Sequence, residues 1–238
     1  MKRTLTIILL GTLILVLTAC QGVRGNGNVT TESYNVSDFD SISLAGMGDL
    51  EITVGETESL TITTDENLLQ YLEVAVEGST LNIRTQNGIT IAQVTELNYA
   101  VTVTDLEAID LSGAGTITLS DLTTESLVVD ISGAGEATLS DLDLDNLSIE
   151  ISGAGEATLS GEADDFLVDI SGAGSINAYN LETVTADVEI SGAGEANVQV
   201  SESLTGDLSG AASINYRGNA TVDVDTSGVT SINRTDGQ

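Results

Sequence analysis

The sequence contains no proline, no histidine and no tryptophan, and its 238 residues include one cysteine, two phenylalanines and five tyrosines. A single cysteine rules out any disulfide bond within the chain. With so few aromatic side chains, a core must be built from Val, Ile, Leu and Ala. The length is sufficient for one domain with a sizeable core.

Basic residues are also scarce, because six Lys and Arg stand against 37 Asp and Glu, for a net charge of −31. Removal of the first 19 residues takes away Lys2 and Arg3 and leaves four arginines and no lysine, so the net charge becomes 4 − 37 = −33. Such a surface repels nucleic acid and anionic lipid headgroups, and attracts divalent cations or basic partners. We therefore expect no nucleic-acid partner. We attribute most of the negative charge to the solubility of the protein rather than to a partner.

The N-terminus has the pattern of an export signal. Lys2 and Arg3 precede an almost wholly apolar run over residues 4–19, which is shorter than the roughly 20 residues that a membrane-spanning helix needs. The run ends in "LTAC", which resembles a bacterial lipobox, the site at which a signal peptide is cut before a lipid-modified cysteine. We expect a lipoprotein signal peptide over residues 1–19 and a lipid on Cys20. The alternative is an uncleaved membrane anchor.

Either interpretation places the rest of the chain outside the cytoplasm. The Gly- and Asn-rich stretch over residues 20–30 predicts a flexible tether between the lipid and the folded part. Gln21, rather than an aspartate, follows the cysteine and favours sorting to the outer membrane if the cell has two membranes. The predicted location is therefore the bacterial cell envelope, with the membrane as a partner through the lipid.

The remainder of the chain is repetitive, since "SG" pairs recur at steps of 20, 20, 19, 20, 18 and 18 residues, beginning at Ser112, Ser132, Ser152, Ser171, Ser191, Ser209 and Ser227. Within each repeat, apolar and polar residues alternate, which is the period of a β-strand. Strands of this kind, separated by Gly-rich turns, predict an all-β fold, a right-handed parallel β-helix (solenoid) with 18–20 residues per coil. We expect a single β-helix domain over residues 31–236, less regular over 53–101 and with regular repeats over 107–234.

The recurring "SGAG" is expected to form a sharp corner between two strands, where glycine supplies a positive φ and close approach between coils. Phosphate binding by this loop is disfavoured, because no lysine or helix follows it and it recurs in every coil. The stretch "LAGMGDLEI" over residues 44–52 aligns with "ISGAGEATL", so the solenoid is expected to begin near Tyr34. The less regular stretch "DENLLQYLEV" predicts a short helix or a bulky loop, with Asp65 as the N-cap of the helix.

One column of acids recurs in seven coils, and we call it the acidic ladder: Asp110, Asp130, Glu150, Asp169, Glu189, Asp207 and Asp225. Carboxylates stacked about 4.8 Å apart repel by roughly 1 kcal/mol per pair in water. This ladder is the candidate metal site, and Ca²⁺ is the candidate ion because it prefers carboxylate oxygens. The alternative is a solvated acidic face, which the lack of a known calcium-loop motif favours.

A second column, expected to face outward, consists of Thr and Asn: Thr118, Thr138, Thr158, Asn177, Asn197, Asn215 and Asn233. Stacked side chains of this kind can hydrogen-bond along the solenoid axis and stabilise it. A hydroxyl and amide face can also contact a glycan.

Several motifs together resemble one bacterial family over residues 35–233. They are "SDFDSISLAGMGDLEITVG", "ENLLQYLEV", "LEAIDLSGAG" and the "SIN" triplets at Ser175, Ser213 and Ser231. The family is that of the putative auto-transporter adhesins, head GIN domain. The resemblance implies a right-handed parallel β-helix exported to the cell envelope, often as a lipoprotein, and it supplies no catalytic residues.

Catalysis is constrained by what the mature chain lacks. Without His and Lys, and with Cys20 expected to be acylated, Ser-His-Asp, Cys-His and zinc-His sites are excluded. Paired carboxylates remain, as in glycoside hydrolysis, but a catalytic site should interrupt the repeat. The irregular positions around Tyr179 and Tyr216-Arg217 reveal no such cleft in the sequence. We expect no catalytic residues and no enzyme activity, and no cofactor other than the candidate Ca²⁺.

The predicted function is therefore display of a repetitive β-helix face that binds a protein or glycan ligand. A purely structural envelope component and a carboxylate-based carbohydrate-active enzyme are the alternatives.

Overall fold

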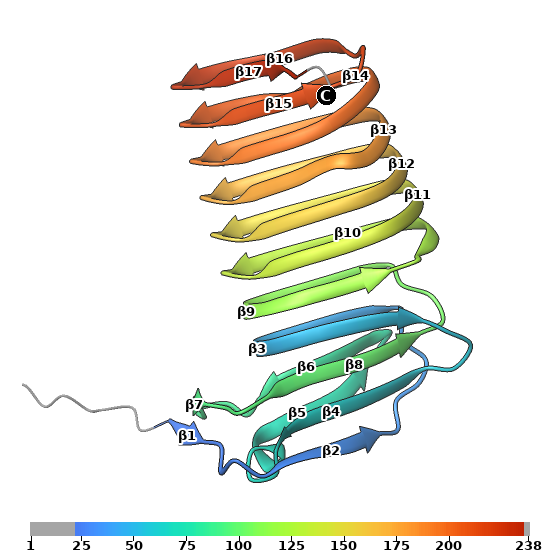
Figure 1. Cartoon of the computed structure of the whole chain (residues 1–238), viewed down its shortest axis with the longest axis vertical. Helices are drawn as coiled ribbons and strands as arrows, with labels where there is room; N and C mark the ends of the chain where they lie inside the picture. The colour runs from blue at the N-terminus through green and yellow to red at the C-terminus, as the bar shows by residue number, and fades with distance from the viewer. Residues whose placement is uncertain (1–21, 236–238) are drawn as a thin grey trace, which may run out of the picture.

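The computed structural model describes residues 22–235, which form one β-solenoid with strands as its only extended secondary structure (Figure 1). The strands are β1 Val23–Arg24, β2 Val29–Tyr34, β3 Ser41–Val54, β4 Ser59–Asp65, β5 Leu72–Glu77, β6 Thr80–Thr85, β7 Ile91–Gln93, β8 Leu97–Val103, β9 Ala108–Ser120, β10 Thr123–Gly133, β11 Glu136–Gly153, β12 Glu156–Gly172, β13 Ser175–Gly192, β14 Glu195–Gly210, β15 Ser213–Arg217, β16 Thr221–Gly228 and β17 Ser231–Arg234. A single 3₁₀ turn, Leu69–Tyr71, lies between β4 and β5.

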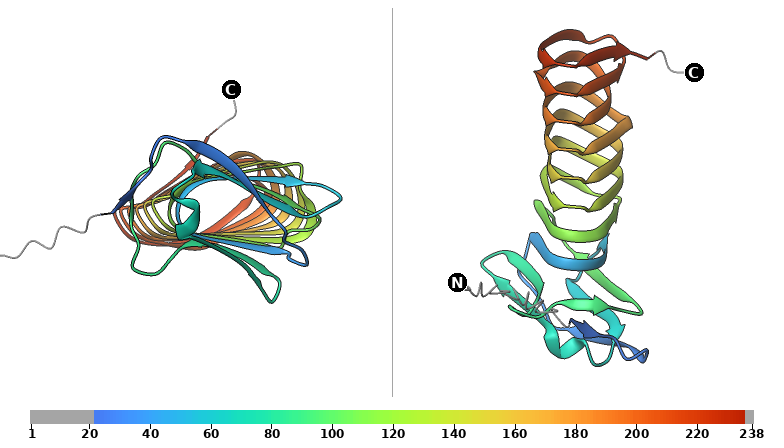
Figure 2. Two further views of the ribbon diagram at one scale, coloured as in Figure 1. Left: turned by 90° about the horizontal axis from the view of Figure 1, so that it is seen from below. Right: turned by 90° about the vertical axis from the view of Figure 1, so that its left-hand side faces the viewer.

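The regular part is a parallel stack, as the repeat spacing predicts. Strands β9 to β17 pair only in parallel, and the register joins each residue to its counterpart one repeat later, for example Asp130 to Glu150. Figure 2 shows that the stack forms a flattened tube when it is viewed along its axis. The prediction of an all-β solenoid with 18–20 residues per coil is confirmed.

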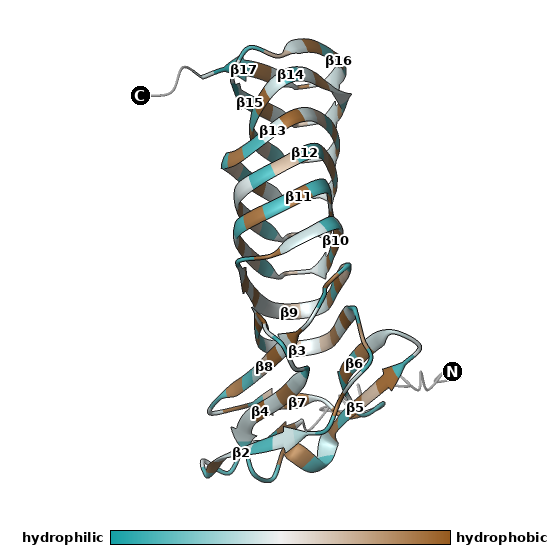
Figure 3. Ribbon diagram, turned by 90° about the vertical axis from the view of Figure 1, so that its right-hand side faces the viewer, coloured by the Kyte–Doolittle hydropathy of each residue, from teal (hydrophilic) through white to brown (hydrophobic). Residues whose placement is uncertain are grey.

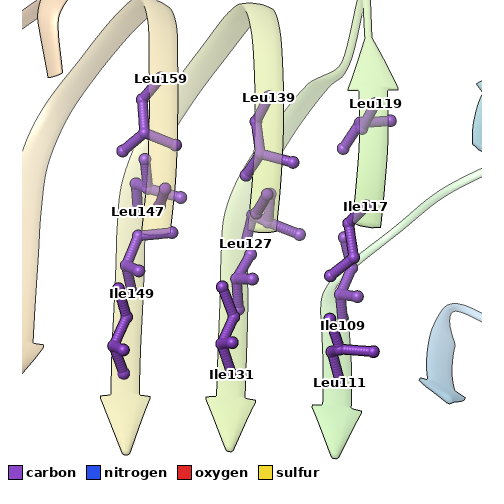
Figure 4. Close-up of a cluster of buried hydrophobic side chains, with 14 of the residues drawn as sticks. Ile109, Leu111, Ile117, Leu119, Leu127, Ile131, Leu139, Leu147, Ile149 and Leu159 are labelled. Carbon is purple, nitrogen blue, oxygen red and sulfur yellow. The ribbon is translucent and has the colours of Figure 1, made fainter. Parts of the chain in front are cut away.

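The core is made of aliphatic columns. Ile109, Val129, Ile149 and Val168 lie one above another and are at most 1% exposed, and Figure 4 shows Leu and Ile side chains stacked in the same way in β9 to β12. No single coil could bury these side chains alone, so each coil depends on its neighbours. The solenoid is therefore stabilised by apolar burial that repeats from coil to coil.

The corner glycines behave as the sequence predicts. Gly133 has a φ of +135°, and a Cβ built on it would lie 2.2 Å from the carbonyl oxygen of Gly113 in the coil below. The next amide, that of Ala134, donates a hydrogen bond of 2.9 Å to this same oxygen. Because coil-to-coil hydrogen bonds already use these amides, the corner is structural and does not form a phosphate cradle.

The parallel stack begins at Ser41 rather than near Tyr34. β3 pairs with β9 in full register, and Gly46 and Gly48 align with Gly113 and Gly115, as the alignment of the two motifs predicts. β2, which includes Tyr34, instead runs antiparallel to β4, and β4 runs antiparallel to β8. These strands and the β5–β6 hairpin cover the N-terminal end of the solenoid (Figure 1).

The predicted flexible tether over residues 20–30 is wrong for its described part. Val23 donates a backbone hydrogen bond of 2.8 Å to Thr90, and β1 pairs with β7. A Cβ on Gly25 would overlap the carboxylate of Asp65, so glycine is required for this close approach. Composition alone suggested a linker, but the small residues serve to fit the segment against the domain. Residues 1–21, which include the predicted signal peptide and Cys20, lie outside the described residues.

Asp65 is not the N-cap of the short helical turn. The turn starts after Leu68, which makes no side-chain cap, whereas Asp65 is the last residue of β4 and is fully buried. Its carboxylate accepts hydrogen bonds from the amides of Gly27, at 2.6 Å, and Thr95, at 2.8 Å, and from the Thr95 hydroxyl. Asp65 therefore joins the N-terminal segment to the loop between β7 and β8.

Candidate functional site

The acidic ladder is a continuous row in the structure. Backbone pairing places all seven predicted acids in register, from Asp110 in β9 to Asp225 in β16, with Ser43 of β3 below them. The Ser43 hydroxyl donates a hydrogen bond of 3.3 Å to Asp110. Ladder residues are exposed or half-buried.

One carboxyl of the ladder has a raised pKa. Partial burial of Asp130, together with the neighbouring charge of Asp110, raises the pKa of its carboxyl above the ordinary value. Over residues 22–235, however, no three Asp, Glu, His or Cys side chains are close enough together to hold one metal ion. The ladder thus forms a linear row of separate carboxylates in this structure.

The Thr and Asn column is also in register, from Thr118 to Asn233. Its upper part forms the expected hydrogen bonds along the axis: Asn215 donates to Asn197 at 2.9 Å, and Asn233 donates to Asn215 at 3.1 Å. The column therefore stabilises the last coils, and its exposed and half-buried side chains present a polar stripe of Thr followed by Asn.

The two irregular positions of the sequence meet in space. The Arg217 guanidinium carbon lies 4.0 Å from the centre of the Tyr179 ring, although the residues belong to β15 and β13. Thr235 donates a hydrogen bond of 3.3 Å to the Tyr179 hydroxyl. Tyr179 in β13 thus contacts both β15 and the segment after β17. The sequence did not reveal these contacts.

Arg217 stands at one end of a groove of about 660 Å³ that crosses β11 to β15. The groove lies on the bends of the coils, at the end of the flattened tube opposite to the "SGAG" corners, and Figure 3 looks onto these bends. One of its rows is in register across five coils: Asp143, Glu162, Glu182, Gln199 and Arg217. We call this row the groove row.

The floor of the groove is a second register column, formed by Leu144, Ala163, Thr183 and Val200, each at most 5% exposed. Asp145 and Asp164 follow two of these floor residues along the chain and line the other side. The signal for the groove in the sequence was the change in repeat step from 20 to 19 and 18. The structure absorbs that change here, through register shifts such as that between Ala178 and Glu182.

Two side chains near the N-terminal end, Asp65 and Tyr99, have shifted pKa values that follow from their structural contacts. Hydrogen bonds from Thr95 and Gly27 lower the pKa of the Asp65 carboxyl below its ordinary value, against the opposing effect of its burial. Burial raises the pKa of the Tyr99 hydroxyl well above its ordinary value. Among residues 22–235, no helix is long and apolar enough to cross a membrane.

Comparison with known proteins agrees with the family resemblance. The model of the family described as "Putative auto-transporter adhesin, head GIN domain" matches residues 38–220. No curated protein matches the chain.

Among solved structures, the chain is similar to a putative adhesin from Bacteroides fragilis, with a TM-score of 0.86, 24% identity, and coverage of 90% of this chain and 100% of that one. A protein described as a putative lipid binding protein from Parabacteroides distasonis gives a TM-score of 0.74 and 25% identity, with the same coverage. A putative adhesin from Parabacteroides merdae gives 0.67 and 22%, covering 90% of this chain and 99% of that one. These likenesses establish the same solenoid fold.

Proposed function

Because this chain belongs to the family described as putative auto-transporter adhesin, head GIN domain, we propose that it is a lipid-anchored protein of the bacterial cell envelope. In this proposal residues 1–19 are a signal peptide, Cys20 carries the lipid, and the solenoid presents a repetitive face to a protein or glycan ligand. The role is binding or adhesion, without catalysis.

The observation that carries the proposal is the in-register stacking of identical or chemically similar residues on the surface. Thr118, Thr138 and Thr158 repeat along one stripe, and the acidic ladder repeats along another. A ligand with its own repeat, or many copies of one ligand, can engage such a surface at several coils, which strengthens binding without any single strong site.

The docked N-terminal segment supports a defined orientation. β1 lies beside β7 at the N-terminal end of the stack, whereas β16 and β17 lie at the far end (Figure 1). Since β1 begins only three residues after Cys20, a lipid on Cys20 would keep the N-terminal end near the membrane. The later coils, with their polar stripes, would then be the part most accessible to a partner.

Two experiments test the proposal. Metabolic labelling with an alkyne fatty acid should label the wild-type protein, and Cys20→Ser should lose both the label and the membrane association. Retention of both in the variant would show that the anchor is not a lipid on Cys20.

The binding role is tested by adhesion. Cells that display the protein should adhere better than cells without it to at least one member of a panel of immobilised glycans and envelope or host proteins. If display changes adhesion to none of them, the protein is better regarded as a structural component. If a glycan of the panel is hydrolysed by the purified protein, the carboxylate-based enzyme replaces the binding role.

A further inference from the structure

The groove over β11 to β15 differs from the rest of the surface in combining a hollow with charge of both signs. Five carboxylates line it, from Asp143, Asp145, Glu162, Asp164 and Glu182, and all belong to β11, β12 and β13. Its basic residue, Arg217, lies at the opposite end, in β15. The charge therefore changes sign along the solenoid axis.

The groove is also elongated. Four steps of about 4.8 Å separate the five members of the groove row, so the row is about 19 Å long. An extended peptide of six residues has a similar length, at about 3.3 Å per residue. Floor residues such as Leu144 and Val200 lie beneath the two acidic sides and offer apolar contact to the stems of long side chains.

The spacing of the acids favours a ligand with several positive charges along its length over a single metal ion. Within the described part of the chain no three acidic side chains converge as a metal site requires, so one divalent ion cannot neutralise the groove. A ligand whose positive charges are spread along its length can place one near each carboxylate. The lining of the groove contains no aromatic side chain, and the Tyr179 ring nearby is occupied by Arg217, so the usual stacking platform for a sugar is absent from this groove.

Arg217 supplies a positive charge at one end of the groove. Its side chain lies over the Tyr179 ring, its Nε atom is buried, and this atom has no hydrogen-bond partner among residues 22–235. The facing position in the preceding coil is Gln199, a neutral residue, rather than an acid. Because Arg217 lines the groove and faces a neutral residue, its guanidinium can pair with a carboxylate that a ligand brings to this end.

We propose that this groove binds an extended cationic peptide segment, with its Lys or Arg side chains along the acids of β11 to β13 and a carboxylate at Arg217. This assignment names a ligand class and a site for the binding role under the proposed function, and it rests on that function only for the binding role. A basic segment of a partner protein is thus the ligand class, and complementary charge supplies both attraction and orientation.

The test uses the full-length protein in detergent micelles and a six-residue peptide of alternating lysine and serine that carries an uncharged fluorophore and has a free carboxyl end. Fluorescence anisotropy should show binding at low salt that weakens as salt screens the charges. The same peptide with glutamate in place of lysine should not bind. Absence of binding by the lysine peptide, or equal binding by the glutamate peptide, overturns the proposal.

Matched variants separate the groove from general negative charge. Glu162→Gln with Glu182→Gln removes two groove charges, and we expect the Kd to rise at least about tenfold. Asp169→Asn with Glu189→Gln removes two ladder charges from the same strands, β12 and β13, and should change the Kd less than about threefold. Equal weakening by the two double variants overturns the assignment to the groove.

A peptide with an amidated end tests the role of Arg217. Loss of the carboxylate should weaken binding by about threefold or more, whereas equal or tighter binding of the amide overturns the placement of a carboxylate at Arg217. The adhesion experiment on whole cells is independent of these results. Failure of the peptide with intact cell adhesion removes only the groove proposal, and failure of adhesion with intact peptide binding removes only the cell-surface role.

Discussion

Arg217 and Tyr179 are 38 positions apart in the chain, yet the guanidinium carbon lies 4.0 Å from the centre of the tyrosine ring. β14 separates their coils, so the pair ties three layers of the solenoid together. Thr235 extends this contact to the segment after β17 through its hydrogen bond to the Tyr179 hydroxyl. The pair therefore supports the last coils as well as ending the groove.

Replacement of the Tyr179 ring should loosen the C-terminal coils. Tyr179→Leu removes the cation–π contact and should lower the free energy of unfolding by about 0.5–1 kcal/mol. Hydrogen exchange should become faster in β15 and β17. Tyr179→Phe, which keeps the ring and loses the Thr235 bond, is the control and should have a smaller effect; an equal effect of both variants would assign the stabilisation to the hydroxyl instead.

The corner glycines should tolerate no side chain. In Gly133→Ala the new Cβ meets the Gly113 oxygen at 2.2 Å and the backbone must keep a φ of +135°. Strain of this kind alone costs about 1–3 kcal/mol, and the overlap adds to it. Urea unfolding should show a loss of more than about 2 kcal/mol.

The adjacent Ala134 provides the control for this substitution. Its side chain is exposed, so Ala134→Ser should change the free energy of unfolding by less than about 0.5 kcal/mol. A wild-type stability for Gly133→Ala would mean that the coils do not approach as closely as the structure indicates.

Asp65 should make the N-terminal end sensitive to acid. Its pKa is lower in the folded protein than the value of about 3.9 in the unfolded chain, so its stabilising effect is complete above pH 4 and is lost as the pH falls through the folded value. Asp65→Asn should lower the Tm at pH 7 by several degrees. It should also flatten the acid limb of the stability curve, measured by thermal unfolding from pH 7 to pH 2. An unchanged acid limb in the variant would exclude Asp65 as its source.

Asp130 should have the opposite effect on stability. Its folded pKa is raised, so the charged form is disfavoured by folding, and this destabilisation disappears as the pH falls through the folded pKa toward about 3.9. Asp130→Asn should therefore raise the free energy of unfolding at pH 7 by about 0.2–1 kcal/mol. Asp187→Asn, an equal change of charge at an exposed position outside the ladder, should have a smaller effect. A destabilised Asp130→Asn variant would contradict the repulsion.

The sequence leaves two interpretations of the acidic ladder, a Ca²⁺ site and a solvated acidic face, and the same thermal assay distinguishes them. Because the carboxylates form a row rather than a cluster in the described residues, we expect Ca²⁺ to raise the Tm no more than Mg²⁺ at equal concentration. A larger shift with Ca²⁺, reversed by EDTA and lost in Asp130→Asn with Glu150→Gln, would establish a calcium site in the ladder.

The parts of the structure that repeat were predictable from the sequence. The recurrence of "SG" pairs every 18–20 residues determines which residues stack, so the sequence alone predicts each member of the acidic ladder and of the Thr and Asn column. The close match of residues 44–52 to the later corners likewise placed β3 in the stack.

The parts that do not repeat were not predictable in this way. The antiparallel strands β2, β4 and β8 depend on contacts between segments with no shared pattern, and Asp65 acts through Gly27 and Thr95, which are 38 and 30 positions away. The groove arises where coils of unequal length meet. Ala178 and Glu182 of β13 pair with the adjacent residues Val198 and Gln199 of β14, so β13 accommodates its extra residues between these two positions, and the sequence did not show this.

Exposure of the solenoid on intact cells tests the central claim, that this is an anchored surface-binding protein, most directly. Val229 is 82% exposed, just beyond the end of β16, and the chain has no cysteine other than Cys20. In Val229→Cys, a membrane-impermeant maleimide should label the protein on intact cells, and the labelled protein should sediment with the membranes. Labelling that appears only after the cells are lysed would contradict display at the cell surface.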